Sequence, residues 1–201
     1  DQLNHIVAFE MNIGDSRIDI CRINGSSYAY EIKTEYDTFD RLGSQMQDYL
    51  RTFEKVYVIV PIGRVSDVKN LIPESCGIIS YRITKNREAV FSYQKCAQKN
   101  CCDIKFCLDS LSSGDMSYLL KLLNEKDFKT RADKRTRLLQ IAATRSIWTP
   151  YRKLLRHKYA DQWRFISSIL IGATEHFDQI LPVDIQSFFS SKMDPNLLYA
   201  K

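Results

Sequence analysis

Three charged residues stand on two neighbouring segments that both have the composition of β-strands. Asp19 lies in the segment 17–23, Glu31 and Lys33 lie in the segment 28–34, and Asn24-Gly25 separates the two. Side chains two residues apart in a strand point to the same face, so Glu31 and Lys33 project together. Two carboxylates and an ammonium would be costly as core filling unless they bind a partner. The pattern therefore predicts a hairpin that carries a divalent-metal site.

The hairpin places a geometric condition on this site. A two-residue turn made of Asn24-Gly25 would put Asp19 opposite Tyr30 and point Glu31 to the other face of the sheet. Asp19 and Glu31 converge only if the loop holds an odd number of residues or a β-bulge intervenes, and such loops favour a glycine. We expect one of these two devices.

Each residue of the predicted site has a chemical role. Asp19 and Glu31 supply hard oxygen ligands suited to Mg²⁺ or Mn²⁺, and the backbone carbonyl of Ile32 could add a neutral ligand. Lys33 could orient or deprotonate an attacking water, or neutralise charge that develops at a phosphorus atom. Glu10, on the preceding segment, is a further candidate carboxylate ligand.

The pattern of apolar residues predicts an α/β (α+β) protein in which a sheet is flanked by helices. We expect strands at 6–13, 17–23, 28–34, 56–60, 77–83 and 88–93, with the last pairing back on its predecessor. We expect helices at 38–54, capped by Thr38, and at 66–72. Beyond residue 110 the chain is predicted to be helical, at 115–125, 135–144, 150–159, 163–174 and 185–189, with Thr149-Pro150 starting the third of these. The chain is accordingly divided into a core, 1–110, and a basic helical extension packed on it, 111–201.

Positive charge is concentrated in the segment 121–164. It holds thirteen Lys or Arg residues against four acids, a net charge of +9, which leaves −4 on the rest of the chain. A solvated helical face would explain an isolated basic helix, but beside a metal site this asymmetry favours a phosphate backbone as partner. The candidate nucleic-acid contacts are Lys134, Arg135, Arg137, Arg145, Arg152, Lys153 and Arg156.

The six cysteines and the hydropathy of the chain indicate in which cellular compartment the protein is expected. Four cysteines form a C-x4-C-C-x4-C cluster between Cys96 and Cys107, a spacing unlike that of structural zinc sites. Reduced thiols in a cytoplasmic protein are the favoured interpretation. The most hydrophobic stretch, 165–173, is shorter than the roughly 20 residues that cross a bilayer, so no membrane partner is expected.

Several motifs together resemble the PD-(D/E)xK nuclease superfamily, and within it a bacterial branch. They are Glu10, Arg17-Ile18-Asp19-Ile20, Asn24-Gly25, Tyr30-Glu31-Ile32-Lys33, Asp37-Thr38, Arg41-Leu42, Gln45, Tyr49 and the segment 56–61. The resemblance is clear over residues 6–83. It implies a restriction-endonuclease-like mixed sheet and metal-dependent phosphodiester cleavage. By position, Asp19, Glu31 and Lys33 match the signature residues, Glu10 an earlier acidic position, and Gln45 a site-facing glutamine. Tyr49 and Arg17 are accessory candidates.

These observations predict a Mg²⁺- or Mn²⁺-dependent nuclease that hydrolyses phosphodiester bonds with metal-activated water. The resemblance favours DNA over RNA as substrate. Two alternatives stay open: a nucleic-acid-binding or regulatory module that does not cut, and a delivered nuclease toxin with an immunity partner. A homodimer and a regulatory protein partner are also left open.

Overall fold

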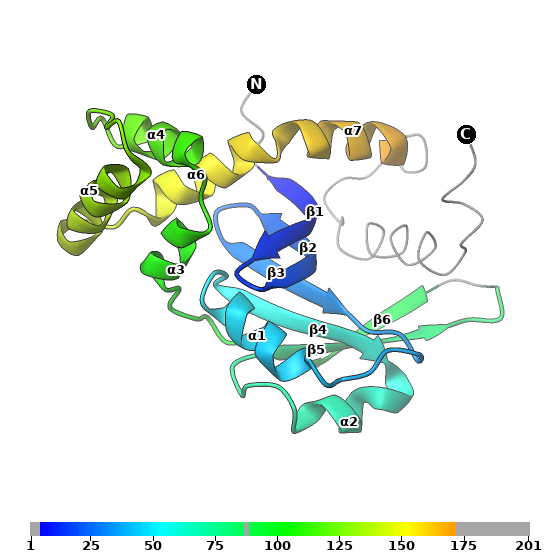
Figure 1. Cartoon of the computed structure of the whole chain (residues 1–201). Helices are drawn as coiled ribbons and strands as arrows, with labels where there is room; N and C mark the ends of the chain where they lie inside the picture. Colours follow the sequence, from blue (N-terminus) through cyan, green and yellow to red (C-terminus); the bar gives the residue numbers. More distant parts are fainter. Residues whose placement is uncertain (1–4, 87–88, 172–201) are drawn as a thin grey trace.

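A mixed six-stranded sheet forms the centre of the protein. The structure, a computed structural model, describes residues 5–86 and 89–171 (Figure 1). The strands are β1 (Ile6–Ile13), β2 (Ser16–Ile23), β3 (Ser27–Ile32), β4 (Lys55–Pro61), β5 (Gly77–Ile83) and β6 (Ala89–Lys95), and they lie side by side in chain order. Pairing is antiparallel from β1 to β3, parallel from β3 to β5, and antiparallel between β5 and β6. The expected α+β class and all six expected strands are confirmed.

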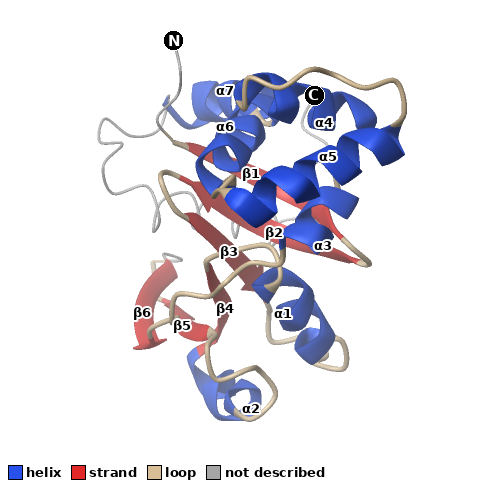
Figure 2. Cartoon of the chain, turned by 90° about the vertical axis from the view of Figure 1, so that its left-hand side faces the viewer, coloured by secondary structure: helices blue, strands red, loops and turns tan. Residues whose placement is uncertain are grey.

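Seven helices of the described chain pack around the sheet. They are α1 (Leu42–Leu50), α2 (Val65–Lys69), α3 (Ile104–Asp109), α4 (Ser113–Leu122), α5 (Arg131–Thr144), α6 (Trp148–Lys158) and α7 (Ala160–Ile171), with a 3-10 turn, η1 (Ile62–Arg64), before α2. Helices α4 to α7 gather toward the β1 end of the sheet, and α2 lies toward its β5 end (Figure 2). Over residues 5–86 and 89–171, no helix combines the length and apolarity needed to span a bilayer.

One hydrophobic cluster joins the sheet to the helices. Val56 to Val60 of β4 are almost fully buried, as expected for a strand covered on both faces. Alternation along β3 places Glu31 on one face and Tyr30 on the other, where the Tyr30 and Tyr57 rings stack 5.6 Å apart. Trp163 of α7 belongs to the same cluster as the sheet residues, so the helices after residue 110 share the core's apolar interior.

The loop between β2 and β3 has three residues, Asn24 to Ser26, because Ile23 pairs with Ser27. The Asn24 N–H donates to the Ser26 carbonyl (3.0 Å), and Gly25 adopts a left-handed φ of +87°. The odd loop length confirms the expected register. Ile20 pairs with Tyr30, which makes Asp19 and Glu31 the next opposed positions on the same face of the sheet.

A matched pair of glycine substitutions tests this loop. At both Gly25 and Gly63 an added methyl group meets no heavy atom within 4 Å, but only Gly25 has a positive φ. We expect Gly25→Ala to lower the free energy of unfolding by about 1–2 kcal/mol, the cost of a left-handed L-residue. Gly63→Ala should be neutral or stabilising by up to about 1 kcal/mol. Urea unfolding of the two variants measures the difference, and equal stabilities would contradict the role assigned to the loop.

Helix α1 begins later than the sequence predicts, and Thr38 does not cap it. Its N-cap is Arg41, which makes no side-chain capping bond. Residues 34–40 form a loop instead, because the Asp37 carboxylate accepts from the Thr34 N–H (2.7 Å) and the Thr34 hydroxyl (2.5 Å). The Arg64 guanidinium holds the same loop by donating to the carbonyls of Thr34, Glu35 and Asp37. Local polar bonds have displaced the first helical turns.

Other boundaries differ by a few residues. Helix α6 begins at Trp148 with Ile147 as N-cap, so the expected roles of Thr149 and Pro150 are wrong. Pro150 is tolerated one turn in because first-turn N–H groups have no intrahelical acceptor. Helix α3 was not expected, and its N-cap Asp103 accepts from the N–H groups of Lys105 and Phe106. Helix α7 corresponds to the start of the expected 163–174 helix, whose last residues lie outside the described range, as does the expected helix at 185–189.

Candidate metal centre

The carboxylates of Asp19 and Glu31 lie in the interior of the protein on adjacent strands. Asp19 is 9% exposed and Glu31 is 3% exposed. The Ile32 N–H donates to Asp19 Oδ2 at 2.7 Å. Because the N–H and C=O of a strand residue point to the same neighbouring strand, the Ile32 carbonyl also faces the β2 side. The three predicted ligand groups, the carboxylates of Asp19 and Glu31 and the carbonyl of Ile32, therefore lie close together where β2 pairs with β3.

Glu31 is the centre of a hydrogen-bond network that reaches across to α1. Glu31 Oε1 accepts from Lys33 Nζ at 2.8 Å and from Gln45 Nε2 at 2.8 Å. Lys33 also donates to Gln45 Oε1 at 3.2 Å. Gln45 and Tyr49 are four residues apart on α1 and present one face of the helix to the carboxylate. The structure thus brings together Asp19, Glu31, Ile32, Lys33, Gln45 and Tyr49, as the sequence predicts.

The hydroxyl of Tyr49 lies between two acceptors. It is 2.8 Å from Glu31 Oε2 and 2.9 Å from the Arg17 carbonyl oxygen, yet it has one proton to give. Both contacts are satisfied at once when Glu31 is protonated, because the acid then donates to Tyr49 and Tyr49 donates to Arg17. Burial and the charge of Glu31 raise the pKa of Tyr49, so the phenol stays protonated at neutral pH.

The electrostatics of Glu31 agree with a proton held at this point. Burial raises the pKa of the Glu31 carboxyl above its ordinary value, and the negative charge of Asp19 raises it further. The ammonium of Lys33 and the bond from Tyr49 oppose this shift. With both acids ionised, two carboxylates and one ammonium leave a net charge of −1 in a buried space. Such a charge takes up either a proton or a cation.

Glu10 occupies the position opposite Asp19 on β1, between the pairs Phe9–Ile20 and Met11–Ile18. Its backbone is left-handed (φ +54°), and its carboxylate forms an ion pair with Arg17 Nε at 2.7 Å. In the part of the chain that the structure describes, no three Asp, Glu, His or Cys side chains are grouped to hold a metal. Glu10 as a third carboxylate ligand stays a prediction that requires its ion pair with Arg17 to open.

The predicted nucleic-acid contacts are largely engaged within the protein. Lys134 is only 7% exposed and donates to the hydroxyls of Ser113 (3.1 Å) and Ser117 (2.6 Å), so its role as a phosphate contact stays a prediction that requires these bonds to open. Four arginines contact acids of the chain: Arg135 with Asp109, Arg137 and Arg145 with Glu125, and Arg152 with Glu54. Lys153 and Arg156 are half-buried on α6. Asp109 and Glu54, from outside the segment 121–164, and Glu125, from within it, offset much of the positive charge of these arginines.

Comparison with known proteins places the chain in a family. The sequence model of the family "Bacteriophage P4 protein cII" matches residues 1–187. The chain belongs to the bacteriophage P4 protein cII family. Within this family, protein cII of Enterobacteria phage P4 is 30% identical over 66 residues, which are 33% of this chain and 25% of the phage protein. The match therefore spans about a quarter of the length of that relative.

A solved structure was also found. The SPO1766 protein of unknown function from Silicibacter pomeroyi is 15% identical, with a TM-score of 0.38, and the alignment covers 72% of this chain and 85% of that chain.

The site residues lie between positions 10 and 49, inside the range that the family model matches. Arg64 and Asp37, which order the loop beside Lys33, were not assigned a role from the sequence. Arg64 contacts carbonyls about 30 residues earlier in the chain, and Asp37 bonds to Thr34 within a loop, so neither contact follows from helix or strand periodicity.

Proposed function

We propose that this chain is a Mg²⁺- or Mn²⁺-dependent nuclease with a restriction-endonuclease-like core of the PD-(D/E)xK type. The observation that carries the proposal is the convergence of Asp19 and Glu31 across β2 and β3, with the Lys33 ammonium 2.8 Å from Glu31. An ammonium held against one of two buried, converging acids can stabilise the negative charge that develops during phosphodiester hydrolysis. The order of Asp19, Glu31 and Lys33 in the sequence also fits the superfamily signature.

The donor set suits a hard divalent cation. Mg²⁺ is commonly bound by one or two carboxylates and keeps several waters, which Asp19, Glu31 and the Ile32 carbonyl could match without a third acid. In its ionised form Glu31 accepts three hydrogen bonds, and a carboxylate has about four lone-pair sites, so one site is left for a cation. A bound ion would supply Lewis acidity to the scissile phosphate and to the attacking water.

The side chains of the network have separate tasks in this proposal. Lys33, with its side chain 13% exposed, would stabilise negative charge that develops on the phosphate. Gln45 holds Lys33 and Glu31 in their relative orientation, since its amide bonds to both. Tyr49 holds the second oxygen of Glu31: its hydroxyl accepts a hydrogen bond from the protonated acid and would donate one to the carboxylate after a cation replaces the proton, which is released to solvent. DNA is the proposed substrate, in line with the superfamily resemblance.

A nucleic-acid-binding module that does not cut is the second candidate. It is favoured by the ion pair between Glu10 and Arg17, which engages the earlier acid within the protein. Incubation of the protein with supercoiled plasmid, linear DNA and RNA, each with Mg²⁺, Mn²⁺ or EDTA, separates the candidates. We expect metal-dependent cleavage of DNA that is lost in Asp19→Ala. Binding without cleavage supports the second candidate, and cleavage that persists in EDTA contradicts the proposed chemistry.

A further inference from the structure

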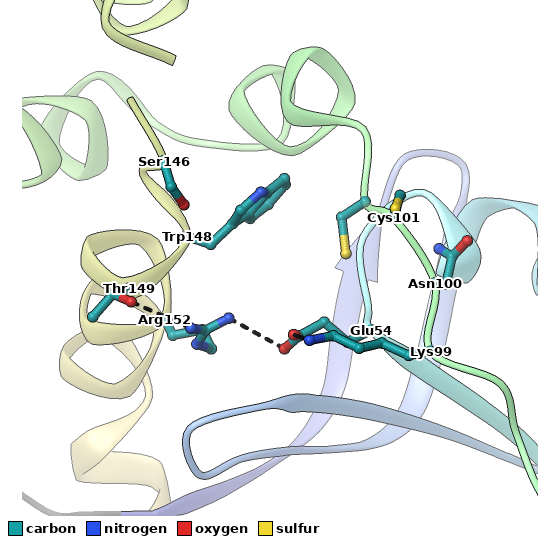
Figure 3. Close-up of a pocket in the computed structure, with 9 residues that line it drawn as sticks. Glu54, Lys99, Asn100, Cys101, Ser146, Trp148, Thr149 and Arg152 are labelled. Carbon is teal, nitrogen blue, oxygen red and sulfur yellow. Dashed lines mark hydrogen bonds and ion pairs between the residues drawn. The ribbon is translucent and has the colours of Figure 1, made fainter. Parts of the chain in front are cut away.

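A cavity of about 320 Å³ lies between the start of β4 and the N-terminus of α6 (Figure 3). Its walls include Glu54, Lys99, Cys101, Trp148, Thr149 and Arg152. Glu54 accepts from the Ser27 N–H (2.9 Å) at the first residue of β3, four residues before Glu31. At roughly 3.3 Å per strand residue, the two places are about 13 Å apart. The cavity is therefore separate from the candidate metal centre.

Charge in the cavity is arranged around Glu54. Its carboxylate forms ion pairs with Arg152 Nη1 at 3.2 Å and with Lys99 Nζ at 3.6 Å. The Glu54 and Arg152 side chains are only 14% and 18% exposed, so this ion pair is held in place at the bottom of the cavity. The Lys99 side chain is 72% exposed. Two cations against one anion leave a net charge of +1, and Lys99 is the cation that can turn toward an incoming anion.

An aromatic wall and a helix N-terminus complete the cavity. The half-buried indole of Trp148 stands across from the Glu54 carboxylate and the Arg152 guanidinium (Figure 3). Trp148 is the first residue of the 11-residue helix α6, and the N-cap Ile147 gives no side-chain bond to the first turn. The backbone N–H groups of Trp148 and Thr149 and the helix dipole therefore add positive potential to the cavity, and the Thr149 hydroxyl lies at the same end of α6.

We propose that this cavity binds a single nucleotide, with its base against Trp148 and its phosphate between Lys99 and the N-terminus of α6. A flat indole is the surface on which bases stack, at about 1–3 kcal/mol per base. Ligand cavities run from roughly 300 to 1,000 Å³, so a cavity of 320 Å³ has room for one nucleotide and not for two. The nucleotide is supplied either free or as an unpaired unit of a strand, and the experiment below distinguishes these two sources. The site requires no cleavage chemistry and no metal.

Two exposed cysteines provide the test within one molecule. Cys101 lines the cavity, and Cys96 is also exposed but is not among the residues that line it. Burial raises the pKa of the neighbouring Cys102 to about 12, so Cys102 reacts slowly. The rate of iodoacetamide labelling at Cys101 and Cys96 is measured by mass spectrometry in EDTA. The added probes are AMP, ribose 5-phosphate, inorganic phosphate or a short single-stranded oligonucleotide.

We expect AMP to slow labelling of Cys101 at least fivefold while Cys96 is unaffected, and ribose 5-phosphate to protect less. Trp148→Leu and the surface variant Lys99→Met should each raise the AMP concentration needed for protection about tenfold, whereas the exposed control Lys69→Met should not change it. Protection by the oligonucleotide but not by AMP assigns the site to a strand. The proposal is overturned if no probe protects Cys101 up to about 10 mM, or if both cysteines are slowed equally. Because EDTA is present throughout, failure here leaves the proposed nuclease function untouched.

Discussion

Replacing Lys33 by methionine is expected to lower the rate of metal-dependent DNA cleavage by about 10²–10³-fold, the range found when one charge-stabilising donor is removed. Lys33 Nζ lies 2.8 Å from Glu31 and is largely shielded from solvent, so neither another side chain of the network nor bulk water can replace its charge. Methionine keeps the apolar length of the side chain and therefore most of its packing. The initial rate at which supercoiled plasmid is nicked in Mn²⁺ measures the effect.

The matched control for this variant is Lys69→Met, which removes a lysine charge from an exposed position of α2. It should leave the rate within about twofold, as expected for a surface charge far from the chemistry. A Lys33→Met protein that is folded and cuts at the wild-type rate would remove Lys33 from the mechanism.

The second large effect is expected from Glu31→Gln, which should abolish cleavage and at the same time stabilise the metal-free protein. Burial and Asp19 raise the pKa of Glu31, so the fold holds its proton more tightly than the unfolded chain does. This contribution to stability is fully present below the unfolded pKa of about 4.3 and is lost as the pH rises through the folded pKa. Glutamine keeps the hydrogen-bonding shape without the buried charge.

We therefore expect the stability difference between Glu31→Gln and wild type to be small near pH 4 and to grow as the pH rises toward 8. A gain of about 1 kcal/mol would raise the Tm of a chain of this size by roughly 2–4 °C. Thermal unfolding in EDTA at several pH values measures it, with the exposed Glu74→Gln as control. A Glu31→Gln protein less stable than wild type at pH 8 would show that the carboxylate is held ionised by Lys33.

The site was predictable from sequence where local rules decide the geometry. Alternation along β3 fixed the common face of Glu31 and Lys33, and the glycine in Asn24-Gly25-Ser26 allowed the odd loop that brings Asp19 opposite. The four-residue spacing of Gln45 and Tyr49 on α1 put both against the same carboxylate. These features depend on strand and helix periods that the sequence displays directly.

The sequence was less informative where a distant partner decides the outcome. Lys134 looks like a surface charge in a basic helix, but Ser113 and Ser117 of α4 enclose it. The first turns expected for α1 are missing because Arg64, beyond β4, binds the carbonyls of residues 34–37. Glu10 stays a predicted ligand, but its left-handed backbone and its ion pair with Arg17 did not follow from the strand pattern. None of these contacts has a signature in the local sequence.

The chain belongs to the bacteriophage P4 protein cII family and carries a pair of buried acids, Asp19 and Glu31. The proposed function requires that these two acids bind a divalent cation. Titration of the protein with Mn²⁺ at pH 8, followed by the electron paramagnetic resonance signal of the free ion, measures this binding directly. We expect saturable binding in the wild type and in Glu74→Gln, weaker binding as the pH is lowered because the proton on Glu31 competes, and loss of this binding in Asp19→Asn. Equal Mn²⁺ binding by wild type and Asp19→Asn, or no binding by the wild type, would contradict the account.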